Sequence, residues 1–140
     1  MADVSFTAAS VVAGSGAAVQ LGTLGEDSVT QGMVLYQSSS DNEWYIADCT
    51  DSSSDAAAGI ALGAGSEDQQ IAILTGGTLT CDNLSLSAAG DAGVYVLSAA
   101  GKICPAADLA EDDYLTIVGV AKAATSLEVK FVVSGVQIVA

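Results

Sequence analysis

GMVLYQSSSDNEWYIADC, residues 32–49, and GVYVLSAAGKICPAAD, residues 93–108, are the two stretches that decide the fold of this chain. Each begins with glycine and continues through a short apolar segment, a loop and a second extended segment. Four landmark pairs keep a separation of 59 to 61 residues: Gly32 and Gly93, Asp48 and Asp108, Gly59 and Gly119, and Gly76 and Gly135. A fixed period indicates an internal repeat. The sequence therefore predicts two similar units, at about residues 29–77 and 90–136.

The apolar segments around these stretches are short and separated by turns rich in Gly, Ser and Asp, which is typical of an all-β sandwich or barrel. The expected strands are 18–23, 33–36, 44–49, 59–62, 71–74, 78–81, 94–97, 102–104, 115–120, 127–133 and 136–139. Gly76 and Gly77 stand between two of them, and a Gly-Gly pair in that position predicts a hairpin. We therefore expect a small β-barrel or sandwich with an internal duplication of about 60 residues.

The size and composition of the chain indicate one domain. Its 140 residues are 51% hydrophobic but only 5% aromatic, so Val, Ile, Leu and Ala must fill the core. Fifteen glycines with a single proline favour tight turns over a disordered linker. Residues 1–18 are small and apolar and precede both repeat units, so we expect an extended N-terminal arm or edge segment there, followed by a single β domain over residues 19–140.

The charge of the chain excludes several partner classes. Seventeen acidic residues face three lysines, with no Arg and no His, for a formal charge of −14. Nucleic acids and anionic membranes are bound by clustered basic side chains, so neither is an expected partner. The N-terminal residues lack a basic segment followed by a long apolar one, and no apolar run approaches bilayer length, so we expect neither a secretory signal nor a membrane span.

No constellation in the sequence indicates catalysis, a metal or a cofactor. Cys49, Cys81 and Cys104 are expected to be small buried apolar residues, because a cysteine nucleophile has no histidine base here. Gly14 and Gly16 lack the other residues of a phosphate-binding loop. The acidic groups do not follow calcium-loop spacing and are expected to be solvated loop tips; they are Asp41 with Glu43, Asp51 with Asp55, and Glu111 with Asp112 and Asp113.

Trp44 and Tyr45 are adjacent on an expected strand. Successive side chains of a strand point to opposite faces, so one ring is expected in the core and the other toward solvent or a partner.

Much of the chain, roughly residues 10–133, resembles the small head decoration (cement) proteins of tailed bacteriophages. The resemblance is carried by VVAGSGAAVQLGT (11–23), QGMVLY (31–36), WYIAD (44–48), AAAGIAL (56–62), ILTGGTLT (73–80), VYVLSAAGKICPAADL (94–109) and IVGVAKAATSLEVKF (117–131). It implies a small Gly- and Ala-rich β-protein without catalytic residues. Such a protein attaches as an oligomer, often a homotrimer, to the outside of an icosahedral capsid and clamps neighbouring subunits of the major capsid protein.

The resulting expectation is a virion protein on the capsid surface, made in the host cytoplasm. We expect the N-terminal arm to make the capsid contact, through Val4, Phe6, Val11 and Val12, because these apolar residues have no counterpart in the second repeat unit. The alternative is a head-fibre or tail-associated module that binds a receptor or glycan. An exposed aromatic groove would favour that alternative, whereas a flat apolar base in a closed oligomer would favour the decoration protein.

Overall fold

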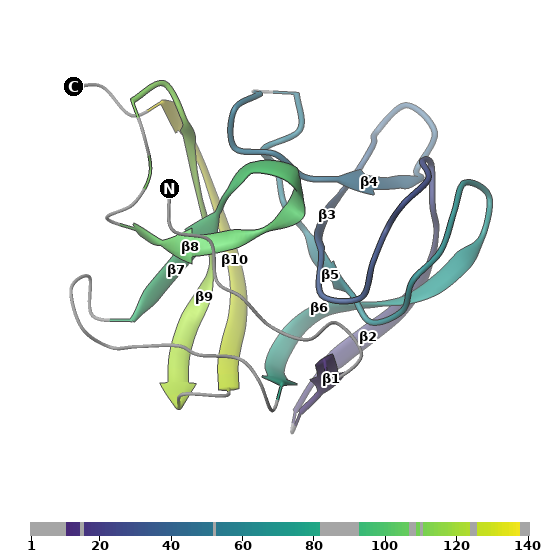
Figure 1. The fold of residues 1–140 in the computed structure, drawn as a ribbon, viewed down its shortest axis with the longest axis horizontal. Coiled ribbons are helices and arrows are strands. Elements are labelled where there is room, and N and C mark those ends of the chain that lie inside the picture. The colour runs from purple at the N-terminus through teal and green to yellow at the C-terminus, as the bar shows by residue number, and fades with distance from the viewer. Residues whose placement is uncertain are drawn as a thin grey trace.

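The computed structural model describes residues 11–14, 16–51, 53–81, 93–106, 109, 111–123 and 126–137. Apart from short 3₁₀ turns, the regular structure of these residues is β-strand, which confirms the expected all-β fold (Figure 1). The first half contains β1 (Val11–Ala13), β2 (Ala18–Thr23), β3 (Val34–Gln37), β4 (Trp44–Ile46), β5 (Gly59–Ala61) and β6 (Gln70–Cys81). The second half contains β7 (Val94–Leu97), the 3₁₀ turn η2 (Ala99–Gly101), β8 (Ile103–Pro105), β9 (Tyr114–Ala123) and β10 (Ser126–Gln137).

The two halves of the sheet have the same arrangement of strands when each is counted from its outer edge to the centre of the sheet. The order is β4-β3-β5-β6-β10-β9-β7-β8, and each pair of neighbours in this order is antiparallel. Each half is therefore a hairpin (β3–β4 or β7–β8) followed by a third strand (β5 or β9) and a fourth (β6 or β10). The two fourth strands pair with each other and join the halves. The halves thus share one strand topology, in agreement with the repeat read from the sequence.

The registers of the two halves agree at one pair of landmark glycines. Gly59 on β5 lies opposite Leu35, and Gly119 on β9 lies opposite Tyr95, so both the glycines and their partners are 60 residues apart. Each glycine is buried where a neighbouring group comes close: a Cβ on Gly119 would press on the carbonyl of Glu128. The lack of room for a side chain at these positions explains why glycine recurs there.

The register does not extend to the last landmark pair. Ile60 lies opposite Leu74, whereas Val120, its counterpart, lies opposite Glu128. The position that corresponds to Gly76 is therefore Lys130 rather than Gly135. Ile60 and Leu74 are 14 residues apart in the chain, whereas Val120 and Glu128 are 8 apart, so the shorter connection between β9 and β10 makes the sequence landmark and the structural one diverge.

The hairpin expected at Gly76 and Gly77 is wrong, because β6 runs through both glycines as one strand. Residues 70–76 of β6 pair with β2, and residues 77–80 pair with β10, so β6 passes from one sheet into the other at this point. Gly77 has a φ of +91°, and a Cβ there would come within 2.5 Å of Ala17 Cα. The glycine pair bends a strand between two sheets instead of reversing the chain.

The first half curls into a small barrel. The pairing runs β2-β6-β5-β3-β4, and a parallel bridge between Leu24 and Trp44 brings the end of β2 back to β4. The amide of Gly25 donates to the Trp44 carbonyl at 2.8 Å, next to this bridge. Seven buried side chains fill the interior of this ring: Leu24, Val29, Leu35, Trp44, Ala61, Ile71 and Ile73.

A second core lies between the two halves and includes residues from both. Val34, Ile60 and Leu74 come from the first half, and Leu97 and Leu127 from the second. Hydrogen bonds cross the same boundary: the amide of Gly101 donates to Ala47 O at 2.7 Å, the amide of Tyr114 to Cys49 O at 2.7 Å, and the buried hydroxyl of Thr116 to Asp55 O at 2.6 Å. The halves therefore pack as one body.

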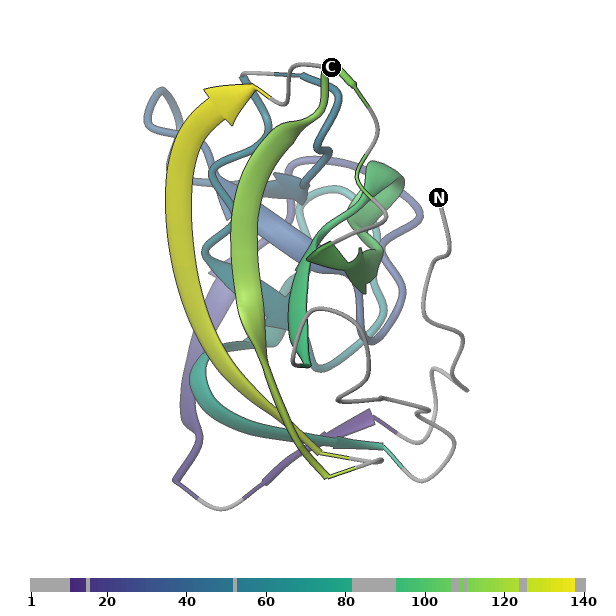
Figure 2. The same ribbon diagram turned by 90° about the vertical axis from the view of Figure 1, so that its left-hand side faces the viewer.

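The C-terminal strand is longer than expected. The segments expected at 127–133 and 136–139 form one strand, β10, through residue 137. Its first residues, 126–129, lie between β6 and β9, but the described residues pair 132–137 with β9 alone. Figure 2 shows β10 as a long curved strand along the outer margin of the molecule, with β9 beside it.

Candidate functional site

The described part of the predicted arm is an edge strand. Val4 and Phe6 lie outside the described residues, whereas Val11 and Val12 belong to β1, where they lie opposite Cys81 and Thr80 of β6. The side chain of Val12 is 53% exposed. Val12 is therefore a predicted contact residue whose side chain lies at the surface.

Gly14 fixes the end of β1 against β6. Its amide donates to Thr78 O at 2.6 Å, and a Cβ at this position would lie 2.9 Å from the Thr80 hydroxyl oxygen. Only glycine allows the chain to approach so closely without displacing a neighbour. Val11–Ala13 are therefore held at the rim of the sheet.

A second apolar surface lies on β2. Val19 is 50% exposed and Leu21 is 66% exposed, and among the described residues β2 pairs along one edge only, with β6. Acidic residues follow at the end of the strand. The amide of Glu67 donates to Asp27 Oδ1 at 3.0 Å, which joins the loop after β2 to the loop before β6. We call Val19, Leu21, Glu26, Asp27, Glu67 and Asp68 the β2 surface.

A third apolar surface lies on β9 and β10. Val120, Val132, Val133 and Val136 are all between 43% and 59% exposed. Lys122 and Lys130 are exposed on the same two strands. Val120 lies opposite Glu128, which is also exposed. We call these four valines and two lysines the β10 surface.

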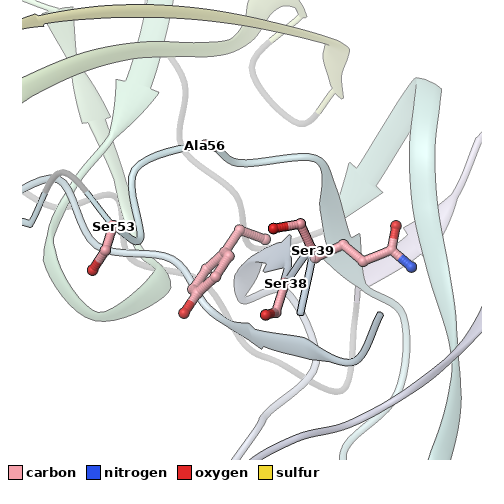
Figure 3. Close-up of a pocket in the computed structure, with 6 residues that line it drawn as sticks. Ser38, Ser39, Ser53 and Ala56 are labelled. Carbon is pink, nitrogen blue, oxygen red and sulfur yellow. The ribbon is translucent and has the colours of Figure 1, made fainter. Parts of the chain in front are cut away.

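A depression of about 500 Å³ lies beside the β3–β4 hairpin. Its lining residues are Tyr36, Gln37, Ser38, Ser39, Ser53 and Ala56. Figure 3 shows Ser53 on one side of this depression and Ser38 and Ser39 on the other. Tyr36 stacks on Tyr45, with ring centroids 5.7 Å apart. As expected for neighbours on a strand, Trp44 is buried in the barrel while Tyr45 is partly exposed.

Tyr45 and Asp41 form a short hydrogen bond near the depression. The phenol of Tyr45 donates to Asp41 Oδ2 at 2.6 Å, which lowers the pKa of Asp41 and raises the pKa of Tyr45 to about 12. Loss of solvation raises the pKa of Glu43, and the nearby carboxylates of Asp41, Asp68 and Glu67 raise it further. This end of the barrel is therefore strongly acidic.

The described residues contain no group of three or more His, Cys, Asp or Glu side chains that could hold a metal ion. Cys49 and Cys104 are buried in the core, and burial raises the pKa of the Cys49 thiol to about 12. A thiol with so high a pKa is a poor nucleophile at neutral pH. No helix of the described residues is long and apolar enough to cross a bilayer.

Comparisons with protein-family models, with curated proteins and with solved structures find no match to this chain.

The sequence predicted the surface at Val12 of β1, but it did not predict the β2 surface or the β10 surface. The alternation in residues 18–23 identified the strand, but its outer face could not be told from its inner one without knowing which strand covers it. Residues 127–133 and 136–139 were predicted as strands, but nothing in their sequence indicated that Val132, Val133 and Val136 would be exposed. The lysines at 122 and 130 were the available signal, because they interrupt the apolar pattern of both strands.

Proposed function

We propose that this chain is a structural virion protein that decorates the outer surface of an icosahedral phage capsid, as a homotrimer that clamps neighbouring major capsid protein subunits. One observation carries the proposal: β1, anchored on β6, presents the exposed Val12 at the point where the predicted arm with Val4 and Phe6 joins the body. An apolar segment at a sheet rim is suited to a groove on another protein. The exposed position of Val12 supports the proposal that the arm makes the capsid contact.

The charge and the oligomer fit the same role. A clamp stabilises a shell by binding the assembled form rather than loose subunits. Three weak contacts presented together give much higher avidity than one. The net charge of −14 keeps free copies soluble until they dock.

The test is decoration of capsids that lack this protein. Truncation of residues 2–9 removes Val4 and Phe6 but leaves β1 intact, and we expect the truncated chain to fold and to bind such capsids poorly. Val12→Ser removes one exposed side chain; burial of a valine contributes about 1.5 kcal/mol, so each contact should weaken roughly tenfold. Ala13→Ser is the matched control on the same edge strand and should bind normally.

Two measurements decide the result. Binding is followed by co-sedimentation, and shell stability by the temperature at which capsids lose integrity. Decorated capsids should survive to a higher temperature than bare ones. If the truncated and Val12→Ser chains decorate and protect like the parent, the arm is not the contact; if the parent chain binds no capsid, the proposed function is wrong.

A specific observation favours a second candidate, a receptor- or glycan-binding module. The depression beside Tyr36 combines an aromatic ring with three serine hydroxyls, and sugars are bound by stacking on aromatic rings and by hydrogen bonds to hydroxyls. Screening the protein against a glycan array separates the candidates. Binding that is lost in Tyr36→Ala and retained in Val12→Ser would establish the second function, and an array without binding would exclude glycans as its ligand.

A further inference from the structure

The charge of this chain is distributed unevenly between its halves. Residues 19–81 contain nine acidic residues and no lysine, whereas residues 93–137 contain all three lysines and five acidic residues. Two of the lysines, Lys122 and Lys130, are exposed on the β10 surface. The molecule is therefore strongly acidic at one end and carries its exposed cations on the other half.

The β10 surface has an open strand edge. The described residues pair Val132, Val133 and Gln137 only with β9, so the opposite edge of this part of β10 has no strand partner among them. Residues 129–137, VKFVVSGVQ, contain no acidic residue and no proline. Long apolar strand edges promote pairing with another chain, and most proteins block them with charge, proline or a covering element. Lys130 is the one charged residue in this stretch.

The β2 surface has the complementary properties. Its strand pairs with β6 along one edge, and the described residues place no strand on the other edge of residues 18–23. Val19 and Leu21 are exposed, as the valines of β10 are. This surface contains acidic residues, whereas the β10 surface contains lysines. Glu67 and Asp68 lie next to the end of β2, where the Asp68 amide donates to Leu24 O at 2.8 Å.

We propose that a second copy of this chain occupies the β10 surface through its own β2 surface. The open edge of β10 on one copy extends the sheet of the next copy at β2, the exposed valines pack against Val19 and Leu21, and Lys122 and Lys130 face the acidic residues at the end of β2. This contact deepens the proposed function, because it is the subunit interface of the proposed trimer and leaves Val12 free for the capsid.

Charge favours this head-to-tail contact over a contact between two identical surfaces. Two β2 surfaces would bring carboxylates together, and two β10 surfaces would bring lysines together without a countercharge except Glu128. A contact between unlike surfaces leaves each copy with one used and one free surface. Such a contact closes into a ring when the rotation between copies allows it, and a threefold ring satisfies every surface.

The first test uses the full chain and analytical ultracentrifugation at micromolar concentration. The parent chain should sediment as an oligomer that weakens as salt rises, because salt screens the charged part of the contact. Leu21→Ser should be monomeric, and so should Val132→Ser combined with Val136→Ser. Val12→Ser is the matched control: its side chain is equally exposed but lies outside both surfaces, and its oligomer should match that of the parent.

An equimolar mixture of the two monomeric variants separates unlike from like contacts. The Leu21→Ser chain retains an intact β10 surface, and the Val132→Ser/Val136→Ser chain retains an intact β2 surface. The mixture should therefore form a dimer although neither variant associates alone. A monomeric mixture, or a Leu21→Ser chain that dimerises by itself, would overturn the proposal. Circular dichroism of each variant checks that it is folded, and an unfolded variant is replaced by Leu21→Thr or Val136→Thr.

A charge exchange tests the polar part. Lys130→Glu and Glu67→Lys should each weaken the oligomer at low salt by about tenfold or more. The chain carrying both changes should associate more tightly than either single variant. Lys102→Glu makes the same charge change away from the β10 surface and should leave the oligomer intact. Failure of the double variant to recover would contradict the charge pairing, whereas an intact oligomer that binds no capsid would contradict only the proposed function.

Discussion

At the scale of single residues, the clearest pair is Tyr45 and Asp41. The hydrogen bond between them favours the protonated phenol and the ionised carboxylate. It therefore contributes to stability between the two titrations. The contribution is lost as pH falls through the lowered pKa of Asp41, and it is lost at the alkaline end as pH rises from the ordinary tyrosine value of 10.0 to about 12.

This leads to a prediction for Asp41→Asn. Removal of the carboxylate should lower the pKa of Tyr45 from about 12, because the charged acceptor and its field are gone. Absorbance at the tyrosinate band during an alkaline titration of the folded protein measures the change. Asp27→Asn is the control and should leave the titration unchanged, because the Asp27 carboxylate accepts from the Glu67 amide and does not act on Tyr36 or Tyr45. Identical curves for Asp41→Asn and the parent would contradict the assignment.

Strand residues illustrate what a sequence can say about individual side chains. One of Trp44 and Tyr45 was expected in the core and the other toward solvent, and Trp44 is buried while Tyr45 is partly exposed, because alternation along a strand is a local property. Exposure of Val132 and Val136 is not local, because it depends on β10 extending beyond the strand that covers its first residues. The sequence pattern does not show how far β10 extends beyond the part that pairs with β6.

At the scale of elements, the glycine pair of β6 decides how the two sheets are connected. Gly77 adopts a positive φ and has backbone atoms of residues 16 and 17 against the position of a Cβ, whereas nothing lies within 4 Å of a Cβ at Gly76. The two neighbours thus differ in how well they would accept a side chain.

We therefore expect Gly77→Ala to destabilise the protein by about 1–3 kcal/mol, since it combines an unfavourable φ with a close backbone contact. Gly76→Ala is the matched control and should have little effect or a slightly stabilising one. Urea denaturation followed by Trp44 fluorescence gives both values. Equal stabilities of the two variants would show that β6 does not depend on Gly77 for its bend.

Strand prediction was accurate where the pattern is local and wrong where two strands merge. Residues 18–23 and 94–97 were predicted with the observed bounds. Gly-Gly between two apolar runs fits a hairpin and a bent strand equally well, because both need a residue free to adopt positive φ. Only the pairing of β6 with β2 and β10 distinguishes them.

At the scale of the whole molecule, both halves depend on the core between them. Leu127 of β10 is fully buried in that core, while Trp44 lies in the separate barrel core of the first half. If the halves unfold together, a substitution in one must be detected by a probe in the other.

Leu127→Ala should lower the free energy of unfolding by about 2–5 kcal/mol, as expected for a buried leucine. Fluorescence of Trp44, which reports on the first half, and circular dichroism, which reports on all strands, should give the same midpoint. Two separate transitions, with Trp44 unaffected by the substitution, would show that the halves are independent domains. Val12→Ala, at an exposed position outside the β2 and β10 surfaces, is the control and should change stability little.

The antiparallel pairing of β6 with β10 also determines where the polypeptide can be cut. Because these strands occupy the same place in each half and join the halves directly, a break between residues 81 and 93 separates the chain along that seam without dividing either hairpin. Two fragments expressed together would reassemble through the pairing of β6 in one fragment with β10 in the other. The fold is thus suited to a split-protein design in which reassembly reports that two fused partners have met.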